Sequence, residues 1–237
     1  MRFTFRFRWI PFIAAAIAVA VGISLGQWQM RRAAEKEAIE LRLSVRESAP
    51  PMVLGTVPAI AEEMEYRRVS VKGEFIRDWP VYLDNRPYKG VAGFFVLMPL
   101  KIAGSELHVL IARGWIPRNI ADRSALPPIA TPAGLIEIEG IARRNPGHLL
   151  QLGRAEVLRP GAIVQNLGID EFAHASKLAM QPFLIEQLND TRDALIRDWP
   201  RASTGIDKHL GYAFQWYALA AMAVIFFVVT GFRRGTQ

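Results

Sequence analysis

The sequence predicts a membrane protein in which two transmembrane helices flank an α+β domain with a mainly antiparallel sheet. Two apolar segments without charged residues, one near each end of the chain, predict the helices. Between them, short runs rich in β-branched and aromatic residues are separated by turns that contain glycine and proline, which predicts a sheet. The expected segments are an N-terminal tail, a first helix, the domain, a second helix and a C-terminal tail, over residues 1–8, 9–27, 28–208, 209–232 and 233–237.

The first helix is predicted from the apolar run 9–26, which follows three arginines among the first eight residues. Only Ser24 in this run is clearly polar, and 18 residues are long enough to cross a bilayer. Two interpretations remain open, a cleaved signal peptide and an uncleaved signal anchor, and we favour the anchor. Because the run begins at residue 9, a mitochondrial transit peptide has no room, which favours a bacterial membrane.

Small residues recur along this first helix. Ala14, Ala18, Gly22 and Gly26 stand at a strict four-residue spacing. Such a small-xxx-small face lets a second helix approach closely. We therefore expect the second helix, which is rich in alanine, to pack against it; the alternative is a chance pattern in an alanine-rich segment.

The second helix is predicted from residues 212–232, which contain no charged residue. Twenty-one helical residues span about 31 Å, the thickness of the hydrocarbon core. Tyr212, Trp216 and Tyr217 lie at one end, where aromatic rings prefer the interface, and His209 stands just before them. An ionisable residue at the edge of a span is a candidate functional residue. The alternative is an interfacial histidine that only anchors the helix.

Charge placement predicts the topology and excludes one class of partner. Arginines adjoin both apolar segments at the chain ends, which places both ends in the cytoplasm and the intervening domain in the periplasm. Arg31, Arg32 and Lys36 on the outer flank oppose this, but long translocated domains follow charge less closely. Residues 29–208 hold 24 basic and 22 acidic residues, so a basic nucleic-acid-binding face is not expected.

The segment between the spans should begin as a helix and continue as a sheet. Residues 27–48 contain no glycine or proline and read as a helix that continues out of the membrane, ended by Pro50 and Pro51. A further helical turn is expected at 58–65 and a short helix at 170–178, with Asp170 as N-cap. Strands are expected at 66–76, 81–85, 94–102, 107–116, 135–142 and 183–188, the third and fourth forming a hairpin.

The residue inventory limits the chemistry. The chain has no cysteine, which excludes disulfides, thiolate catalysis, iron–sulfur clusters and covalent haem attachment through CxxCH. His108, His148 and His174 are scattered without metal-binding spacing. No nucleophile–base set is recognisable, so we do not expect an enzyme.

Five blocks of residues occur in order along the chain. They are Leu25-Gly26-x-Trp28-Gln29-x-x-Arg32-x-x-x-Lys36, Tyr66-Arg67-Arg68-Val69-x-Val71-x-Gly73-x-Phe75, Gly93-x-x-Val96-x-x-Pro99-Leu100, Arg113-Gly114-Trp115-Ile116-Pro117 and His209-Leu210-x-Tyr212-Ala213-x-x-Trp216. This set resembles the surfeit locus protein 1 family, assembly factors for haem–copper cytochrome c oxidases. The resemblance covers about residues 25 to 219.

The resemblance implies a respiratory-chain assembly factor, or chaperone, of a bacterial inner membrane. Its expected cofactor is haem a, bound non-covalently, with His209 as axial ligand of the haem iron. Its expected partners are oxidase subunit I, other assembly factors and the lipid bilayer. The alternatives are a scaffold that holds subunit I without binding haem and, further removed, a membrane-anchored periplasmic hydrolase.

A helical arrangement gives this expected haem site a definite face. His209, Ala213, Trp216 and Ala220 share one side of a helix, with Tyr212 beside it. We expect the alanines to leave space for a flat macrocycle and Trp216 to stack on it. The cofactor-binding residues are then His209, Tyr212 and Trp216. Lys208 or Arg201 could pair with the propionates.

The predicted topology can be tested by reporter fusions. Alkaline phosphatase fused near residue 120 should be active, because the enzyme folds only in the periplasm, and the same fusion after residue 234 should be inactive. The reverse pattern would contradict the topology.

Overall fold

The computed structural model describes residues 3–5, 7–119, 121–122, 125–147, 149, 156–199 and 205–234. The chain divides into two compact units. Met1–Arg42 and Arg201–Gln237 form a helical unit, and Leu43–Pro200 form a β domain.

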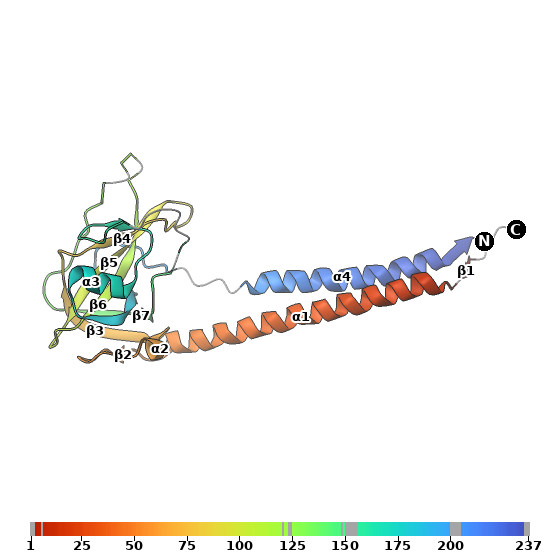
Figure 1. The fold of residues 1–237 in the computed structure, drawn as a ribbon, viewed down its shortest axis with the longest axis horizontal. Coiled ribbons are helices and arrows are strands. Elements are labelled where there is room, and N and C mark those ends of the chain that lie inside the picture. Colours follow the sequence, from red (N-terminus) through yellow and green to blue (C-terminus); the bar gives the residue numbers. More distant parts are fainter. Residues whose placement is uncertain are drawn as a thin grey trace. The chain divides into compact units, whose positions relative to one another are not determined.

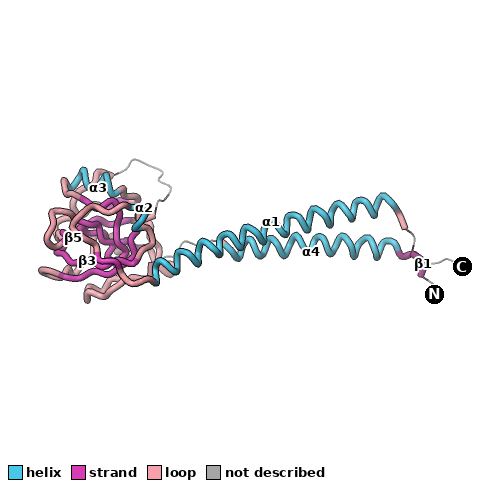
Figure 2. The backbone as a smooth tube through the Cα atoms, turned by 90° about the horizontal axis from the view of Figure 1, so that it is seen from below, coloured by secondary structure: helices cyan, strands magenta, loops and turns pink. Residues whose placement is uncertain are grey.

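Two long helices make up most of the helical unit. Helix α1 (Trp9–Ser48) has 40 residues and helix α4 (Ile206–Gly231) has 26. They lie side by side in opposite directions (Figures 1 and 2), with a short antiparallel ladder between β1 (Phe3–Phe5) and β10 (Phe232–Arg234). Both helices are long and apolar enough to cross a membrane, and most of their large apolar side chains are exposed. As predicted, α1 continues without a break from the apolar run into the charged residues that begin at Arg31, and it ends before Pro50 and Pro51.

The β domain is built on one eight-stranded sheet. Its strands are β2 (Met52–Val53), β3 (Arg68–Phe75), β4 (Val81–Leu83), β5 (Gly93–Ile102), β6 (His108–Pro117), β7 (Ile136–Arg143), β8 (Ile163–Val164) and β9 (Met180–Gln187). Their order is β2-β3-β7-β9-β6-β5-β4-β8, and β3 also pairs with β5. That extra pairing closes β3, β7, β9, β6 and β5 into a barrel. Most pairs are antiparallel, as predicted, but the closure was not predicted.

Three of the strand pairs are parallel, namely β2–β3, β4–β8 and β6–β9. All six predicted strands are present, and the predicted hairpin is the antiparallel pair β5–β6. The two-residue strands β2 and β8 were not predicted, because two residues carry no periodicity from which a strand can be recognised.

Two short helices complete the domain, α2 (Ala61–Met64) and α3 (Ile169–Ser176). The prediction that Asp170 caps α3 is wrong. The N-cap is Gly168, no side chain caps the helix, and Asp170 lies in its first turn. The helix begins earlier than predicted because Ile169 is buried in the core, so apolar packing determines where the helix starts.

Barrel closure depends on a glycine in β3. Gly73 is aligned with Ile136 of β7 on one side and with Ile102 of β5 on the other. A Cβ at this position would collide with the carbonyl oxygen of Lys101 and with the side chain of Leu100. Only glycine lets the backbones come this close, so β3 can change partners there.

Both faces of the central strands are buried. On β6, Leu110 belongs to the apolar cluster that contains α3, while Ile111 belongs to the cluster of β3, β7 and α2. On β9, Leu184 and Ile185 divide between the same two clusters. This explains why each strand contains an uninterrupted apolar stretch, 109–112 in β6 and 183–185 in β9, instead of a strict alternation.

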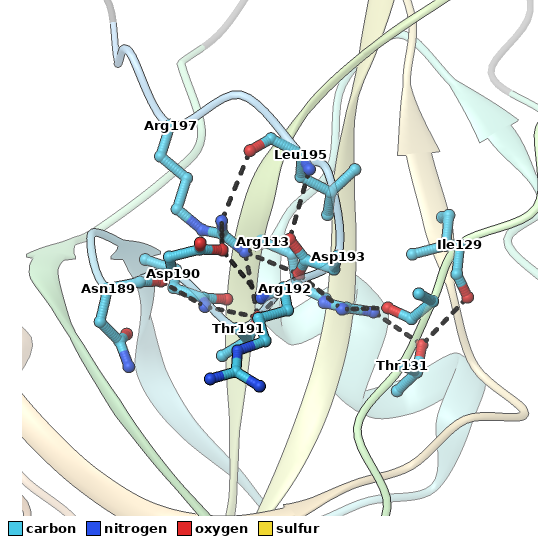
Figure 3. Close-up of polar contacts among 12 residues, drawn as sticks. Arg113, Ile129, Thr131, Asn189, Asp190, Thr191, Arg192, Asp193, Leu195 and Arg197 are labelled. Carbon is cyan, nitrogen blue, oxygen red and sulfur yellow. Dashed lines mark hydrogen bonds and ion pairs between the residues drawn. The ribbon is translucent and has the colours of Figure 1, made fainter.

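A buried polar cluster holds residues 189–197, which follow β9, against β6 (Figure 3). Arg113 on β6 donates a hydrogen bond from Nη2 to Oδ2 of Asp193 at 2.8 Å, and both side chains are fully buried. The same guanidinium also donates to Thr131 Oγ1 at 2.7 Å and to the carbonyl oxygen of Ala130 at 2.8 Å. Arg197 donates to both carboxylate oxygens of Asp193, each at 2.6 Å.

Gly114 and Trp115, which follow Arg113 on β6, also contact residues 195 and 196 of this segment, and Trp115 contacts Arg86 as well. Gly114 has φ +149, and a Cβ there would lie 2.7 Å from the Cβ of Leu195. Trp115 and Ile196 exchange two backbone hydrogen bonds, of 2.7 and 3.0 Å. The indole Nε1 of Trp115 donates to the carbonyl oxygen of Arg86 at 2.6 Å. The Arg-Gly-Trp block therefore packs this segment against β6.

The carboxylate at the centre of this cluster stays ionised. Burial alone would raise the pKa of Asp193, but the hydrogen bonds from Arg197 and Thr191 outweigh that effect and hold the pKa below its usual value. Since the folded pKa is below the unfolded one, the stabilisation is present at neutral pH and is lost as the pH falls through the folded pKa.

We expect Asp193→Ala to lower the free energy of unfolding by about 3–5 kcal/mol, because it leaves two buried guanidinium groups without their shared carboxylate. Denaturant titration of the full chain, followed by tryptophan fluorescence, measures this. Asp78→Ala, at an exposed position, is the control and should change the value by less than about 0.5 kcal/mol. Equal midpoints for the Asp193 variant and the parent would contradict the central role of the carboxylate.

Candidate functional site

The site lies where α1 and α4 pack on each other. Between residues 15 and 36 of α1, the less exposed residues form a row of Ala15, Val19, Gly22, Gly26, Gln29, Ala33 and Lys36. Leu25 is also less exposed and lies beside this row. The spacing within the row alternates between four and three residues. Between residues 209 and 227 of α4, the less exposed residues form a second row of His209, Ala213, Trp216, Ala220, Ala223 and Phe227, again at alternating spacings of four and three. Ala218 is also less exposed and lies beside this row. We call these two rows the seam.

The seam corrects the predicted helix-packing face. Gly22 and Gly26 are buried against α4 as expected, but Ala14 and Ala18 are exposed. A strict four-residue step advances about 40° beyond a full turn each time, so such a row winds away from a partner helix. The alternation of four and three keeps to a period of 3.5, which the helix can hold along a partner over several turns.

The closest approach of the two helices is at the glycines. A Cβ on Gly22 would lie 2.9 Å from the Cβ of Ala220 and 2.9 Å from the carbonyl oxygen of Trp216. A Cβ on Gly26 would lie 2.5 Å from the ring of Tyr217. Neither position has room for a larger residue, so these two contacts fix the register between the helices.

This register brings His209 against Gln29. Nδ1 of His209 lies 2.7 Å from Oε1 of Gln29. Gln29 is 9% exposed, whereas His209 is half-buried. Within the residues that the structure describes, Nε2 of His209 has no hydrogen-bond partner.

The other expected cofactor-binding residues lie around His209 in different environments. Tyr212 is 53% exposed, and Trp216 is half-buried with its carbonyl group beside Gly22. Ala213 and Ala220 are buried, and Ala220 packs on Gly22. The expectation that these alanines leave space for a macrocycle is therefore wrong, because the surface that they offer is covered by α1.

Basic side chains occur close to the start of α4. Lys208 is exposed, and Arg201 falls outside the described residues. Lys36 was not predicted as part of the site. Its Nζ lies 3.7 Å from the position that a Cβ on Gly205 would take, just before α4.

Sequence reasoning thus missed Gln29 and Lys36, although both stand in the first block of the resemblance. The available signal was their seven-residue separation, which places them on one side of a helix with Gly22. Without the register to α4, nothing in the sequence connects that side with His209.

The remaining histidines have structural surroundings. His108 is buried on β6, with Nδ1 3.3 Å from the carbonyl oxygen of Ala179, and burial lowers its pKa. His174 is exposed on α3, with Nδ1 2.6 Å from the carbonyl oxygen of Asp170. His148 falls outside the described residues. Among the residues that are described, no group of three or more His, Asp and Glu side chains could hold a metal ion.

Three arginines of the β domain, Arg68, Arg143 and Arg144, take part in ion pairs. Arg68 contacts Glu139 at 3.0 Å, Arg143 contacts Glu186 at 2.9 Å, and Arg144 contacts Glu62 at 3.1 Å. Each of these three arginines is thus paired with a carboxylate of the same domain.

Comparison with known proteins assigns the family. The sequence profile of the SURF1 family matches residues 16–221, which include Gln29, the glycines of the seam and His209. The chain belongs to the SURF1 family. This bears out the resemblance that the five blocks carry.

Relatives in the family come from bacteria and eukaryotes. A SURF1-like protein of Monosiga brevicollis is 28% identical over 228 residues, covering 88% of this chain and 82% of that protein. A SURF1-like protein of Rickettsia felis is 22% identical over 223 residues, covering 92% of this chain and 95% of that protein. The yeast cytochrome oxidase assembly protein SHY1 is 30% identical over 98 residues, covering 40% of this chain and 25% of that protein.

The seam can be tested by crosslinking. The chain has no cysteine, and the ring centroids of Phe12 and Phe227 lie 5.7 Å apart, so Phe12→Cys with Phe227→Cys should be joined by a short bifunctional thiol reagent. Adding Gly22→Leu should reduce the crosslinked fraction several-fold, because the new side chain would overlap Ala220. Ala18→Leu is the matched control on the exposed side of α1 and should leave the fraction unchanged. Equal loss with both leucines would contradict the seam.

Proposed function

We propose that this chain is an assembly factor for haem–copper cytochrome c oxidase that holds or presents haem a for insertion into subunit I. Membership of the SURF1 family and the relative named cytochrome oxidase assembly protein support a role in oxidase assembly. The observation that carries the haem proposal is the state of His209, since one ring nitrogen contacts Gln29 and the other is unpaired in the described part of the chain.

The residues present suit the haem group. A neutral imidazole is a common axial ligand of haem iron. Bound haem would supply the iron and a flat apolar ring. In this proposal Nε2 of His209 is the ligand atom, the exposed Tyr212 and the half-buried Trp216 contact the ring, and Lys36 or Lys208 pairs with the propionates. Since Ala213 and Ala220 are covered by α1, the ring would lie beside the seam on the Tyr212 side.

We further propose that the protein resides in a bacterial inner membrane, with α1 and α4 as its spans and the β domain in the periplasm. Two helices of sufficient length and apolarity support this, as do Rickettsia relatives of similar extent. Gln29 and His209 then lie at the periplasmic edge of the bilayer, because the charged residues of α1 begin at Arg31, two positions after Gln29.

One observation favours a second candidate function. The burial of Ala213 and Ala220 removes the space first expected for the macrocycle, which suits a scaffold that holds subunit I without haem. No contact described above favours the other alternative, a membrane-anchored periplasmic hydrolase.

Purification from cells that make haem a tests the proposal. The protein should carry non-covalent haem that acidified organic solvent extracts. His209→Ala should lose most of it and lower the haem a content of the oxidase, whereas Trp216→Ala should weaken binding less, since an aromatic contact contributes only about 1 kcal/mol. His174→Ala, at an exposed position in the β domain, is the control and should change nothing.

Two results would overturn haem ligation by His209. One is an unchanged haem content and optical spectrum in the His209→Ala protein. The other is a parent protein that carries no haem although haem a is present, which would leave the scaffold as the function.

A further inference from the structure

Gln29 is an uncommon residue for the position that it occupies. It is 9% exposed and stands on the seam between Gly26 and Ala33, which are both buried. A buried amide is destabilising unless it is hydrogen-bonded, by about 1–3 kcal/mol. In the described part of the chain, the hydrogen-bond partner of its side chain is His209. This polar contact lies among the small apolar residues Gly26, Ala33 and Ala213 of the seam.

The contact determines which nitrogen of the imidazole carries the proton. A carbonyl oxygen can only accept a hydrogen bond. With Oε1 of Gln29 placed 2.7 Å from Nδ1 of His209, the contact is a hydrogen bond in the tautomer in which Nδ1 carries the hydrogen and donates it. In the neutral ring Nε2 then has a free lone pair, which is the form that binds a metal ion.

The backbone leaves this contact little freedom. The close approach at Gly22 and Gly26 fixes the register between α1 and α4 within two turns of Gln29. Gln29 can therefore not move along the seam away from His209 without moving the whole helix against Tyr217 and Ala220.

We propose that Gln29 is a positioning residue that holds His209 in the Nδ1–H tautomer and presents Nε2 to the haem iron. This inference rests on the proposed function. Gln29 does not touch the haem itself; it acts through the imidazole, as hydrogen-bond acceptors behind metal-binding histidines commonly do.

The first test uses the protein without haem. With ¹⁵N-labelled histidine in mildly alkaline solution, Nδ1 of His209 should give the shift of a protonated ring nitrogen and Nε2 that of an unprotonated one. The His209→Ala protein identifies the signals. Gln29→Leu, which cannot accept a hydrogen bond, should convert His209 mainly to the Nε2–H form, while Gln27→Leu, at an exposed position on the same helix, should not.

The second test uses the protein loaded with haem and compares two substitutions at one position. Gln29→Glu should lower the midpoint potential of the haem, because a carboxylate acceptor makes the imidazole a stronger electron donor and favours ferric iron. Gln29→Leu should raise the potential and weaken haem binding about 10-fold or more. A purely structural role for Gln29 would not produce opposite shifts from the two variants. Gln27→Leu should leave the potential unchanged.

The outcomes separate this inference from the function on which it rests. A parent protein that binds haem, but whose haem-free form holds His209 as the Nε2–H tautomer, overturns the role of Gln29 alone. Potentials that shift in the same direction in both variants do so as well. A parent protein without haem overturns the proposed function, and ligand presentation with it. If Gln29→Leu does not fold, the tautomer in the parent and the potential of Gln29→Glu still decide.

Discussion

The close approach of α1 and α4 at Gly22 and Gly26 is the contact on which the candidate site depends. The two glycines leave no space for a different register, since Ala220, the Trp216 carbonyl group and the Tyr217 ring occupy the surface opposite them. Because both helices are rigid, the register set at this point also determines which residues of α1 and α4 face each other further along the pair. One to two turns away, it places Gln29 against His209. The site is thus a consequence of helix packing and does not require a dedicated loop.

The β domain relies on a comparable constraint, a few positions at which backbone must pass close to backbone. Gly73 allows β3 to pair with both β7 and β5 and so closes the barrel. Gly114 admits the segment around Leu195, and Asp193 holds that segment by neutralising two arginines. Two of the blocks that identify the family, around Gly73 and around Arg113, are therefore explained by packing and closure, and two, around Gln29 and His209, meet at the candidate site.

The elements that were predicted correctly are those with a local physical signal. Long uncharged apolar runs indicate helices that can cross a membrane, and β-branched runs between turns indicate strands. The prediction of Asp170 as a cap was wrong because burial of Ile169, a tertiary effect, determines the helix start. The small-residue face was half right, since composition shows that small residues are present but not which of them face a partner.

The sequence by itself determined the two apolar helices, most of the sheet, the absence of thiol chemistry and the family. It also identified His209 as a candidate, because an ionisable residue at the end of an apolar segment can be recognised from the sequence alone. Only the tertiary structure decided that the barrel closes, that α1 covers Ala213 and Ala220, and that Gln29 contacts His209. The physical reason is that these contacts join residues up to 180 positions apart, and their pairing depends on helix register and strand order, which no local pattern encodes.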